Sequence, residues 1–292
     1  MATRTQLRRP EWLKIRLESN ETLHQVREKV RGLRLHTVCE EARCPNLHEC
    51  WSAGTATFMI LGDICTRTCG FCSVGKGRPG TLDPEEPRHV GEAVRDLGIR
   101  HAVVTSVNRD ELPDGGSHHF AETIAWIRRL NPAVTVEVLI PDFMGDWSAL
   151  ANVLEARPEI LNHNIETVPR LYRTVRPQAV YDRSLELLQR AASWRSDEYP
   201  VLTKSGLMVG IGETKEEVFE VLADLRRYDV DIVTIGQYLN PTARHIPVQR
   251  FVPPAEFAEY RARAAELAFT LCEAGPFVRS SYHAERGVRP RD

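Results

Sequence analysis

Apolar runs typical of buried strands alternate with amphipathic runs typical of helices along most of this 292-residue chain. Six such strand-helix pairs follow residue 54. The expected strands are 55–62, 101–107, 135–141, 160–166, 202–210 and 231–239, and the expected helices are 89–98, 117–130, 147–156, 181–194, 215–228 and 254–269. Strands that are apolar throughout are buried on both faces, so the alternation predicts an α/β fold with a parallel sheet covered by helices.

Both a doubly wound open sheet and a barrel fit this alternation. The chain has neither G-x-G-x-x-G after the first expected strand nor G-x-x-x-x-G-K-S/T, which disfavours nucleotide-binding doubly wound folds. Polar residues gather where the expected strands end. They form the stretches TSVNRDELPDGG (105–116), NHNIET (162–167), GIGET (210–214) and GQYLNPT (236–242). Parallel α/β folds place their active sites at that end, so we expect these loops to line one cavity.

Six of the seven cysteines lie in two compact triplets between residues 39 and 72. The stretch CEEARCPNLHEC holds the first triplet, and CTRTCGFC, after the first expected strand, holds the second. The start of the chain has no apolar signal core, so we expect a cytoplasmic location, where thiols stay reduced and bind metal. Thiolates are soft ligands that select zinc, Cu(I) or iron–sulfur clusters.

The spacing of the second triplet does not suit a closed zinc site. Structural zinc usually has four ligands, often supplied by two C-x2-C pairs, and here only Cys69 and Cys72 form such a pair. His48 and His89 are candidates for a fourth ligand, but neither has the usual spacing. Three thiolates on a four-iron cluster leave one iron open to a substrate or cofactor. A zinc-stabilised binding protein is kept as an alternative that explains the cysteines but not the polar loops.

Composition limits the other possibilities. A formal net charge of -2 argues against bulk binding of nucleic acid. No apolar run approaches the ~20 residues needed to span a bilayer. The seventh cysteine, Cys272, lies in AAELAFTLCEAG, where we expect it to share a buried helical face with Leu267, Ala268 and Leu271.

The second triplet resembles the signature of the radical S-adenosylmethionine (SAM) superfamily. Cys65, Cys69 and Cys72 have the spacing C-x3-C-x2-C on the loop after the first strand, and Phe71 precedes the last cysteine as in that signature. In this superfamily, the amino and carboxylate groups of SAM chelate the open iron of a 4Fe-4S cluster. One electron then cleaves the sulfonium and yields a 5′-deoxyadenosyl radical.

The first triplet and the stretch GPFVRSSYHA (275–284) resemble the lipoyl synthase family, as do the polar loops, with coverage from about residue 35 to about residue 285. In that family, a serine of the Arg-Ser-Ser-Tyr motif is a ligand of an auxiliary 4Fe-4S cluster. The resemblance implies Cys39, Cys44, Cys50 and Ser281 as its ligands, with Ser281 preferred to Ser280.

The resemblance also implies an activity. Enzymes of this family insert two sulfur atoms, at C6 and C8, into an octanoyl chain that is amide-linked to a lysine of a lipoyl carrier domain or of the glycine-cleavage H protein. The auxiliary cluster is the sulfur donor. Partners would be that octanoylated carrier, an electron donor such as flavodoxin or ferredoxin, and an iron–sulfur cluster carrier. Unactivated C–H bonds have no acidic proton, so the cofactor supplies the chemistry and the protein supplies orientation.

Two other classes of radical SAM sulfurtransferase, the methylthiotransferases and the biotin-synthase-like enzymes, are alternatives. Methylthiotransferases spread their additional cysteines over a separate domain, and the gap between Cys50 and Cys65 is too short for one. Biotin-synthase-like enzymes hold their sulfur donor inside the barrel. The compact first triplet and the RSSY stretch disfavour both classes.

By the same resemblance, the fold should be a partial (β/α)6 TIM-like barrel. Residues 1–54 would form an N-terminal cysteine-bearing extension, 55–270 the barrel, and 271–292 a tail closing over the barrel mouth. Polar residues at the strand ends are candidates for binding SAM. Asn108 and Asp110 would bind its amino or carboxylate end, Glu166 its ribose hydroxyls, and Arg176 and Lys204 its carboxylate.

Overall fold

An eight-stranded sheet forms the centre of the molecule in the computed structural model, which describes residues 8–14, 20–52, 56–282 and 284–287. The strand order is β1-β2-β5-β6-β7-β8-β9-β10. β1 is antiparallel to β2, and all other neighbours are parallel. The strands are β1 (His36–Thr37), β2 (Thr57–Ile60), β5 (His101–Ser106), β6 (Thr135–Leu139), β7 (Ile160–Asn162), β8 (Leu202–Val209), β9 (Ile232–Gln237) and β10 (Leu271–Gly275). A separate parallel pair consists of β3 (Ile64–Cys65) and β4 (Gly75–Lys76).

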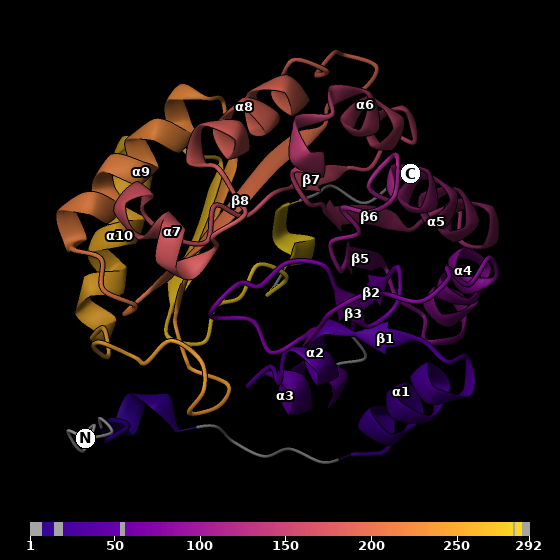
Figure 1. The fold of residues 1–292 in the computed structure, drawn as a ribbon, viewed down its shortest axis with the longest axis horizontal. Helices are drawn as coiled ribbons and strands as arrows, with labels where there is room; N and C mark the ends of the chain where they lie inside the picture. Colours follow the sequence, from indigo (N-terminus) through magenta and orange to yellow (C-terminus); the bar gives the residue numbers. More distant parts are fainter. Residues whose placement is uncertain (1–7, 15–19, 53–55, 283, 288–292) are drawn as a thin grey trace.

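Figure 1 shows the strands curving into an arc with the long helices on its outer side. These helices are α4 (Glu86–Asp96), α5 (Ser117–Leu130), α6 (Trp147–Glu155), α8 (Tyr181–Ala192), α9 (Lys215–Arg227) and α10 (Pro254–Glu266). Shorter elements are η2 (Phe143–Gly145), η3 (Pro169–Leu171) and α7 (Tyr172–Val175). The two edges of the sheet, β1 and β10, are separated in the arc. The expected partial TIM-like barrel is confirmed.

The interior explains why the strands read as continuous apolar runs. All four residues of β2 and all six of β9 are buried, and Phe58, Val104 and Ile235 are completely covered. One face of the sheet packs on the helices and the other faces the inside of the arc. Because both faces of these strands are covered, apolar residues are favoured at every position rather than at alternate positions.

Each of the six expected strand-helix pairs is present, but the chain after α10 was predicted wrongly. The helix ends at Glu266, and Ala268 has φ 59°, which stops further helical turns. Residues Leu271–Gly275 then form β10 beside β9, so Cys272 lies on a strand and is only partly buried. The seventh parallel strand was not expected from the sequence.

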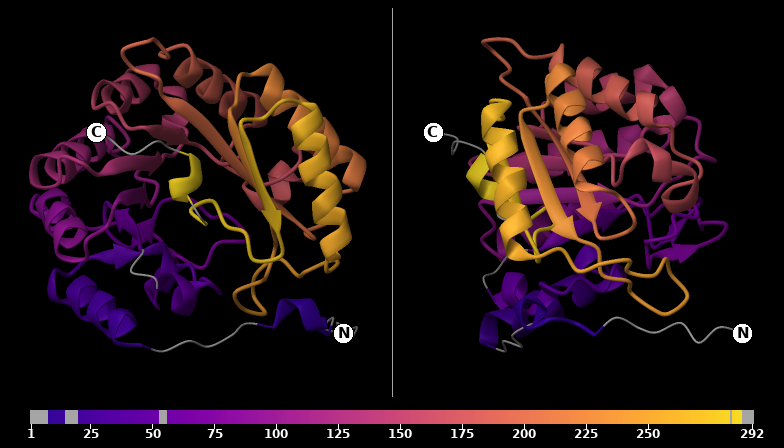
Figure 2. Two further views of the ribbon diagram at one scale, coloured as in Figure 1. Left: turned by 180° about the vertical axis from the view of Figure 1, so that it is seen from behind. Right: turned by 90° about the vertical axis from the view of Figure 1, so that its left-hand side faces the viewer.

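The N-terminal segment lies at the open side of the arc, and the C-terminal tail runs back into the interior of the arc. The segment contains η1 (Glu11–Leu13), α1 (Glu21–Gly32), α2 (Val38–Glu41) and α3 (Leu47–Ser52), and the tail contains η4 (Ala284–Gly287). Figure 2 shows η4 inside the ring of strands. The Asn46 side-chain amide donates to the Phe277 carbonyl at 2.7 Å, which joins the two segments directly. The expected boundary between residues 54 and 55 lies outside the described residues.

No helix in the described ranges combines the length and the apolar character that a membrane crossing requires.

Candidate functional site

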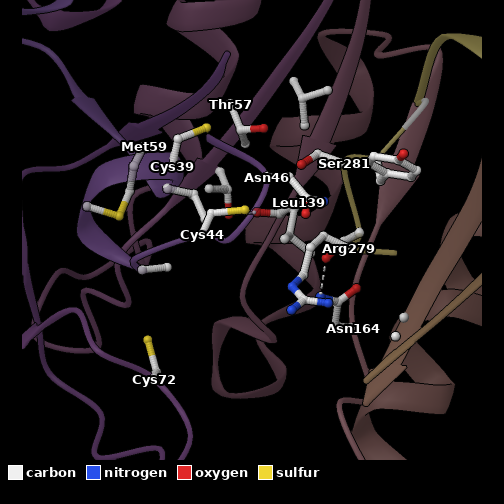
Figure 3. Close-up of a pocket in the computed structure, with 18 of the residues that line it drawn as sticks. Cys39, Cys44, Asn46, Thr57, Met59, Cys72, Leu139, Asn164, Arg279 and Ser281 are labelled. Carbon is white, nitrogen blue, oxygen red and sulfur yellow. Dashed lines mark hydrogen bonds between the residues drawn. The ribbon is translucent and has the colours of Figure 1, made fainter. Parts of the chain in front are cut away.

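One cavity of about 1030 Å³ is lined by all six clustered cysteines. Its wall also includes Ser280 and Ser281 from the tail, together with polar residues from the loops after several strands. Figure 3 shows Cys39 and Cys44 on one side of this space, with Ser281 across from them and Cys72 farther along the wall. Three of the four polar loops expected to share a cavity, at 105–116, 162–167 and 236–242, contribute residues to this wall, whereas residues 210–214 do not.

The loop that carries the second triplet is attached to several barrel loops. Thr66 donates its backbone N–H and its hydroxyl to the Asn108 carbonyl, at 3.1 and 3.0 Å. The Gly70 N–H donates to the Val175 carbonyl at 2.8 Å. A ring nitrogen of His245 lies 3.0 Å from the Cys72 carbonyl oxygen. These contacts, together with the pairing of β3 and β4 at its ends, fix the loop with its three thiols at the cavity.

A buried ion-pair network lies under this loop. Arg67, between the first two cysteines of the triplet, donates two 2.8 Å hydrogen bonds to Asp110 and one of 2.6 Å to Asp142. Arg183 donates to the other oxygen of Asp142 at 2.8 Å. Burial alone would raise the pKa of Asp142, but Arg67 and Arg183 lower it to about 2. The loop is therefore joined to the ends of β5 and β6 by charged groups as well as by backbone contacts.

Hydrogen bonds and burial set the properties of the thiols in the second triplet. The Cys65 sulfur accepts hydrogen bonds from the backbone N–H of Arg67 at 3.4 Å and of Asn108 at 3.3 Å. Burial raises the pKa of Cys69, and burial raises the pKa of Cys72 to about 11, with the other thiols of the triplet adding to both shifts. Cys69 and Cys72 are therefore protonated near neutral pH until a metal displaces the proton.

The first triplet lies beside the sheet edge, with Cys39 on α2, Cys50 on α3 and Cys44 in the link between these short helices. Thr37 caps α2 by accepting from the Glu40 N–H at 3.3 Å, and this places the buried Cys39 against β2. The Cys44 N–H donates to the Cys39 carbonyl at 3.1 Å. Burial, and then the neighbouring Cys44 thiol, raises the pKa of Cys39 to about 11, and burial also raises the pKa of Cys44.

The tail crosses the cavity, and its two serines have different surroundings there. The Ser280 hydroxyl oxygen accepts a 2.9 Å hydrogen bond from the Asn164 side-chain amide. Ser281 faces the side of the cavity where Cys39 and Cys44 lie. The tail approaches β9 so closely that a Cβ on Gly236 would lie 2.1 Å from the Val278 carbonyl oxygen. Only glycine fits at that position of the strand.

A polar wall lies between the triplets. Glu166 accepts a 3.0 Å hydrogen bond from Asn164, and Arg176 donates to the Asn164 carbonyl at 2.6 Å. Glu166 has φ 63°, an uncommon backbone conformation for a non-glycine residue that often marks a functional position. Burial raises the pKa of Glu166, although Arg176 opposes that shift. Asn108, Glu166 and Arg176 line the cavity, as expected.

Two of the expected SAM-binding residues lie outside the cavity wall. Asp110 does not line the cavity, and both of its carboxylate oxygens accept hydrogen bonds from Arg67. Lys204 does not line it either. Its ammonium group is 3.0 Å from each carboxylate oxygen of the buried Glu137 inside the sheet. Both charges are satisfied by protein partners rather than presented to a ligand.

The cysteines fit metal clusters better than single ions. Ligands of one tetrahedral zinc lie within about 4 Å of each other, since each Zn–S bond is about 2.3 Å. Within the part of the chain that the structure describes, no three His, Cys, Asp or Glu side chains are arranged to hold a single metal ion. The thiols of each triplet nevertheless influence one another's pKa and face one cavity. Thiolates spread around a shared space suit a polynuclear iron–sulfur cluster.

Three residues of the site were missed by the sequence reasoning. Arg67 lies inside the second triplet, His245 follows the stretch GQYLNPT, and Arg279 begins the RSSY stretch. Arg67 and Arg279 lie within stretches already singled out in the sequence, which was a usable signal for these two residues. Their contacts were not predictable, because His245 meets Cys72 across 173 positions of sequence.

Comparisons with known families agree with this geometry. The family model described as the radical SAM superfamily matches residues 59–236. The model for the N-terminal domain of lipoyl synthase of the radical SAM family matches residues 1–44. The lipoyl synthase of Rubrobacter xylanophilus is 58% identical over 276 residues, which is 94% of this chain and 85% of that protein. The lipoyl synthase of Symbiobacterium thermophilum is 59% identical over 278 residues, covering 95% of this chain and 86% of that protein.

Solved structures share the fold at low sequence identity. Streptococcus suis SuiB bound to S-adenosylmethionine matches with a TM-score of 0.56 and 11% identity, over 78% of this chain and 54% of that one. Methylornithine synthase matches with a TM-score of 0.53 and 14% identity, over 89% of this chain and 79% of that one. At these identities the likeness concerns the barrel alone.

Proposed function

The chain belongs to the lipoyl synthase family of radical SAM enzymes, and from this premise we propose which of its residues carry out sulfur insertion. Enzymes of this family use SAM and 4Fe-4S clusters. The proposed reaction adds sulfur at C6 and C8 of an octanoyl chain that is amide-linked to a lysine of a carrier protein. One observation carries the proposal: two cysteine triplets from different segments and a tail serine line the same cavity.

Cys65, Cys69 and Cys72 would hold the cluster that binds SAM. When loaded, the cluster of the second triplet would supply reductive cleavage of SAM, and the cluster of the first triplet would supply the sulfur. The backbone N–H groups of Arg67 and Asn108 would hydrogen-bond the Cys65 thiolate and so tune its electron donation. Phe71 lines the cavity and packs against the apolar cluster of Val175, Ile211 and Tyr238.

The polar wall would bind SAM. We assign Glu166 to its ribose hydroxyls, because a half-buried carboxylate facing the cavity is a strong acceptor. Arg176, which lies 5.3 Å from the Tyr172 ring centre and is held by the Asn164 carbonyl, is assigned to the carboxylate of SAM. The Asn108 side chain is assigned to its amino end.

Cys39, Cys44, Cys50 and Ser281 would hold the auxiliary, sulfur-donating cluster. Ser281 is preferred to Ser280 because the Ser280 hydroxyl already accepts from Asn164 at 2.9 Å. An alkoxide is a harder ligand than a thiolate and matches iron–sulfide less well. It would be the ligand that leaves most readily when the cluster gives up its sulfur.

Apolar side chains offer a place for the octanoyl chain between the two triplets. Met59, Val103, Leu139 and Met208 line the cavity from four different strands. The octanoylated lysine would belong to a lipoyl carrier domain or to the glycine-cleavage H protein. An electron donor such as flavodoxin or ferredoxin and an iron–sulfur cluster carrier complete the proposed partners. A reducing, cytoplasmic compartment is proposed because six clustered thiols must stay reduced to bind iron.

The test is anaerobic reconstitution with an octanoyl-lysine carrier peptide, SAM and a reductant. We expect about eight irons per chain, which corresponds to two four-iron clusters. The products should be 5′-deoxyadenosine and a peptide carrying two added sulfurs. A colourless protein that binds zinc and no iron would support the zinc-stabilised alternative instead.

Variants of single cysteines assign the roles. Cys39→Ala should still cleave SAM to 5′-deoxyadenosine but should add no sulfur, because it removes a ligand from the donor side only. Cys72→Ala should abolish both. The matched control is Cys272→Ala, which removes a thiol on β10 that does not line the cavity and should leave both products unchanged. Sulfur insertion by Cys39→Ala would refute the donor assignment.

A further inference from the structure

Arg279 brings an uncompensated positive charge to the cavity. It lies on the tail, lines the cavity near Cys44, and is half-buried. Its Nη1 donates a hydrogen bond to the neighbouring Val278 carbonyl at 2.6 Å. Burial lowers the pKa of Arg279, the nearby Cys44 thiol opposes that shift, and among the described side chains no carboxylate pairs with the guanidinium.

The position of this guanidinium is fixed by the contacts of the tail on both sides. Asn46 binds the Phe277 carbonyl at 2.7 Å, and Asn164 binds the Ser280 hydroxyl at 2.9 Å. Gly236 leaves room for the chain between them, because a Cβ there would also lie 3.1 Å from Arg279 Nη1. A cation held in place in a poorly solvated space is costly unless an anion accompanies it.

The first triplet supplies such an anion once it is metallated. Three thiolates and an alkoxide carry four negative charges, which exceed the charge of an oxidised four-iron core. We propose that Arg279 is the counter-charge of the auxiliary cluster, stabilising its negative charge and retaining it in the site. The proposal rests on the proposed function, because it requires Cys39, Cys44 and Cys50 to bind that cluster. Arg279 is thus a positioning and charge-balancing residue rather than a ligand.

Two measurable properties follow. Net charge and hydrogen bonds to the sulfurs help to set the potential of an iron–sulfur cluster, so loss of the cation should make the auxiliary cluster harder to reduce. Outer-shell partners typically change metal retention by about 10- to 100-fold. Iron should therefore pass from the variant to a ferrous chelator roughly 10-fold faster or more.

The experiment uses the full chain with Cys65, Cys69 and Cys72 replaced by alanine, so that iron can load only at the first triplet. Arg279→Met removes the charge, Arg279→Gln keeps polarity alone, and Arg279→Lys keeps the charge. Arg286→Met is the matched control, because Arg286 is a tail cation whose partner is the surface residue Glu273 at 3.1 Å. Iron content, midpoint potential by EPR-monitored titration, and the rate of iron loss are measured for each.

We expect Arg279→Met and Arg279→Gln to have a lower midpoint potential and faster iron loss, with Arg279→Lys close to the parent and Arg286→Met unchanged. Failure of Arg279→Met to load iron, with an unaltered far-UV spectrum, also supports the proposal if Arg279→Lys loads. An unchanged potential and unchanged iron loss in the uncharged variants would overturn it. A role in SAM binding would also overturn it. In that case, Arg279→Met would weaken SAM binding when it is made in a chain that lacks the first triplet, and it would leave the potential of the auxiliary cluster unchanged in the chain that lacks the second triplet. Absence of iron from the parent itself would instead refute the proposed function.

Discussion

Replacing Arg67 by methionine tests whether the loop that carries Cys65, Cys69 and Cys72 is held by the ion pairs of Arg67. The guanidinium donates two hydrogen bonds of 2.8 Å to Asp110 and one of 2.6 Å to Asp142, and only 3% of its side chain is exposed. Methionine keeps much of the apolar stem but removes the charge and every donor. We expect the metal-free protein to be less stable as a result.

The size of the effect follows from what the two carboxylates retain. Removing one partner of a buried ion pair typically costs about 3–5 kcal/mol. Asp142 is fully buried but keeps Arg183 at 2.8 Å, and Asp110 is 26% exposed, so water solvates it after the change. We therefore expect the free energy of unfolding to fall by about 2–4 kcal/mol. For a chain of this length, that corresponds to a decrease in Tm of roughly 4–8 °C.

Equilibrium urea unfolding of the reduced, metal-free protein, followed by far-UV circular dichroism, measures this loss. Arg183→Met is the matched comparison, because it removes the other cation of Asp142 from a position that is 18% exposed. The double variant leaves Asp142 with neither arginine. Its loss should exceed the sum of the single losses by about 0.5–3 kcal/mol, since both changes act on one carboxylate.

Two results would contradict the reasoning. The first is a loss below about 1 kcal/mol for Arg67→Met, which is the level of an exposed pair. The second is additivity of the two single variants, which would mean that Asp142 is not shared between them. In either case, the loop would owe its conformation to its backbone hydrogen bonds alone.

Three further predictions concern the tail and the buried carboxylate. Ser281→Ala should lose auxiliary-cluster iron faster than the parent while Ser280→Ala keeps it, as measured by transfer of iron to a chelator; the reverse order would exchange the two assignments. Gly236→Ala should displace the tail, because the new Cβ would lie 2.1 Å from a tail carbonyl oxygen, and should lower iron content, whereas Gly32→Ala meets nothing within 4 Å and should be neutral. Asp142 has a pKa of about 2 in the folded protein against 3.8 ordinarily, so its contribution of about 2 kcal/mol is complete above pH 4 and is lost as pH falls toward 2. The difference in unfolding free energy between the parent and Asp142→Asn should therefore be constant above pH 5 and shrink below pH 4, and a difference that does not vary with pH would exclude this origin.

The barrel was predictable because burial on both faces leaves a long apolar run for each strand. β10 was not, because Leu271–Gly275 is an edge strand of mixed residues that are mostly half-buried. Its neighbours Leu267 and Ala268 extend the apolar spacing of α10 past the true end of the helix. The left-handed backbone of Ala268 ends the helix, but alanine, unlike glycine, does not indicate such a conformation in the sequence.

The cysteine triplets and the tail were predictable because their spacing is local in the sequence. Ion pairs are different. In the sequence, an acidic residue that pairs with a protein cation at a strand end cannot be told from one that binds a ligand. Asp110 was assigned to SAM, yet it is bound by Arg67, 43 positions earlier. Lys204 was assigned likewise, yet it pairs with Glu137 across 67 positions. Which cation meets which acid depends on strand register, and local sequence does not encode register.

The open side of the barrel explains why the two triplets are held so differently. Each strand from β2 to β10 has a parallel neighbour, but β1 and β10 end the sheet without meeting. The second triplet follows β2 directly and is held by the loops of a continuous sheet. The first triplet and the tail instead occupy the gap between the sheet edges, where Asn46 and Phe277 join segments 231 positions apart. A metal site built from these two segments closes the gap itself, so its assembly and loss need not break any strand pairing of the barrel.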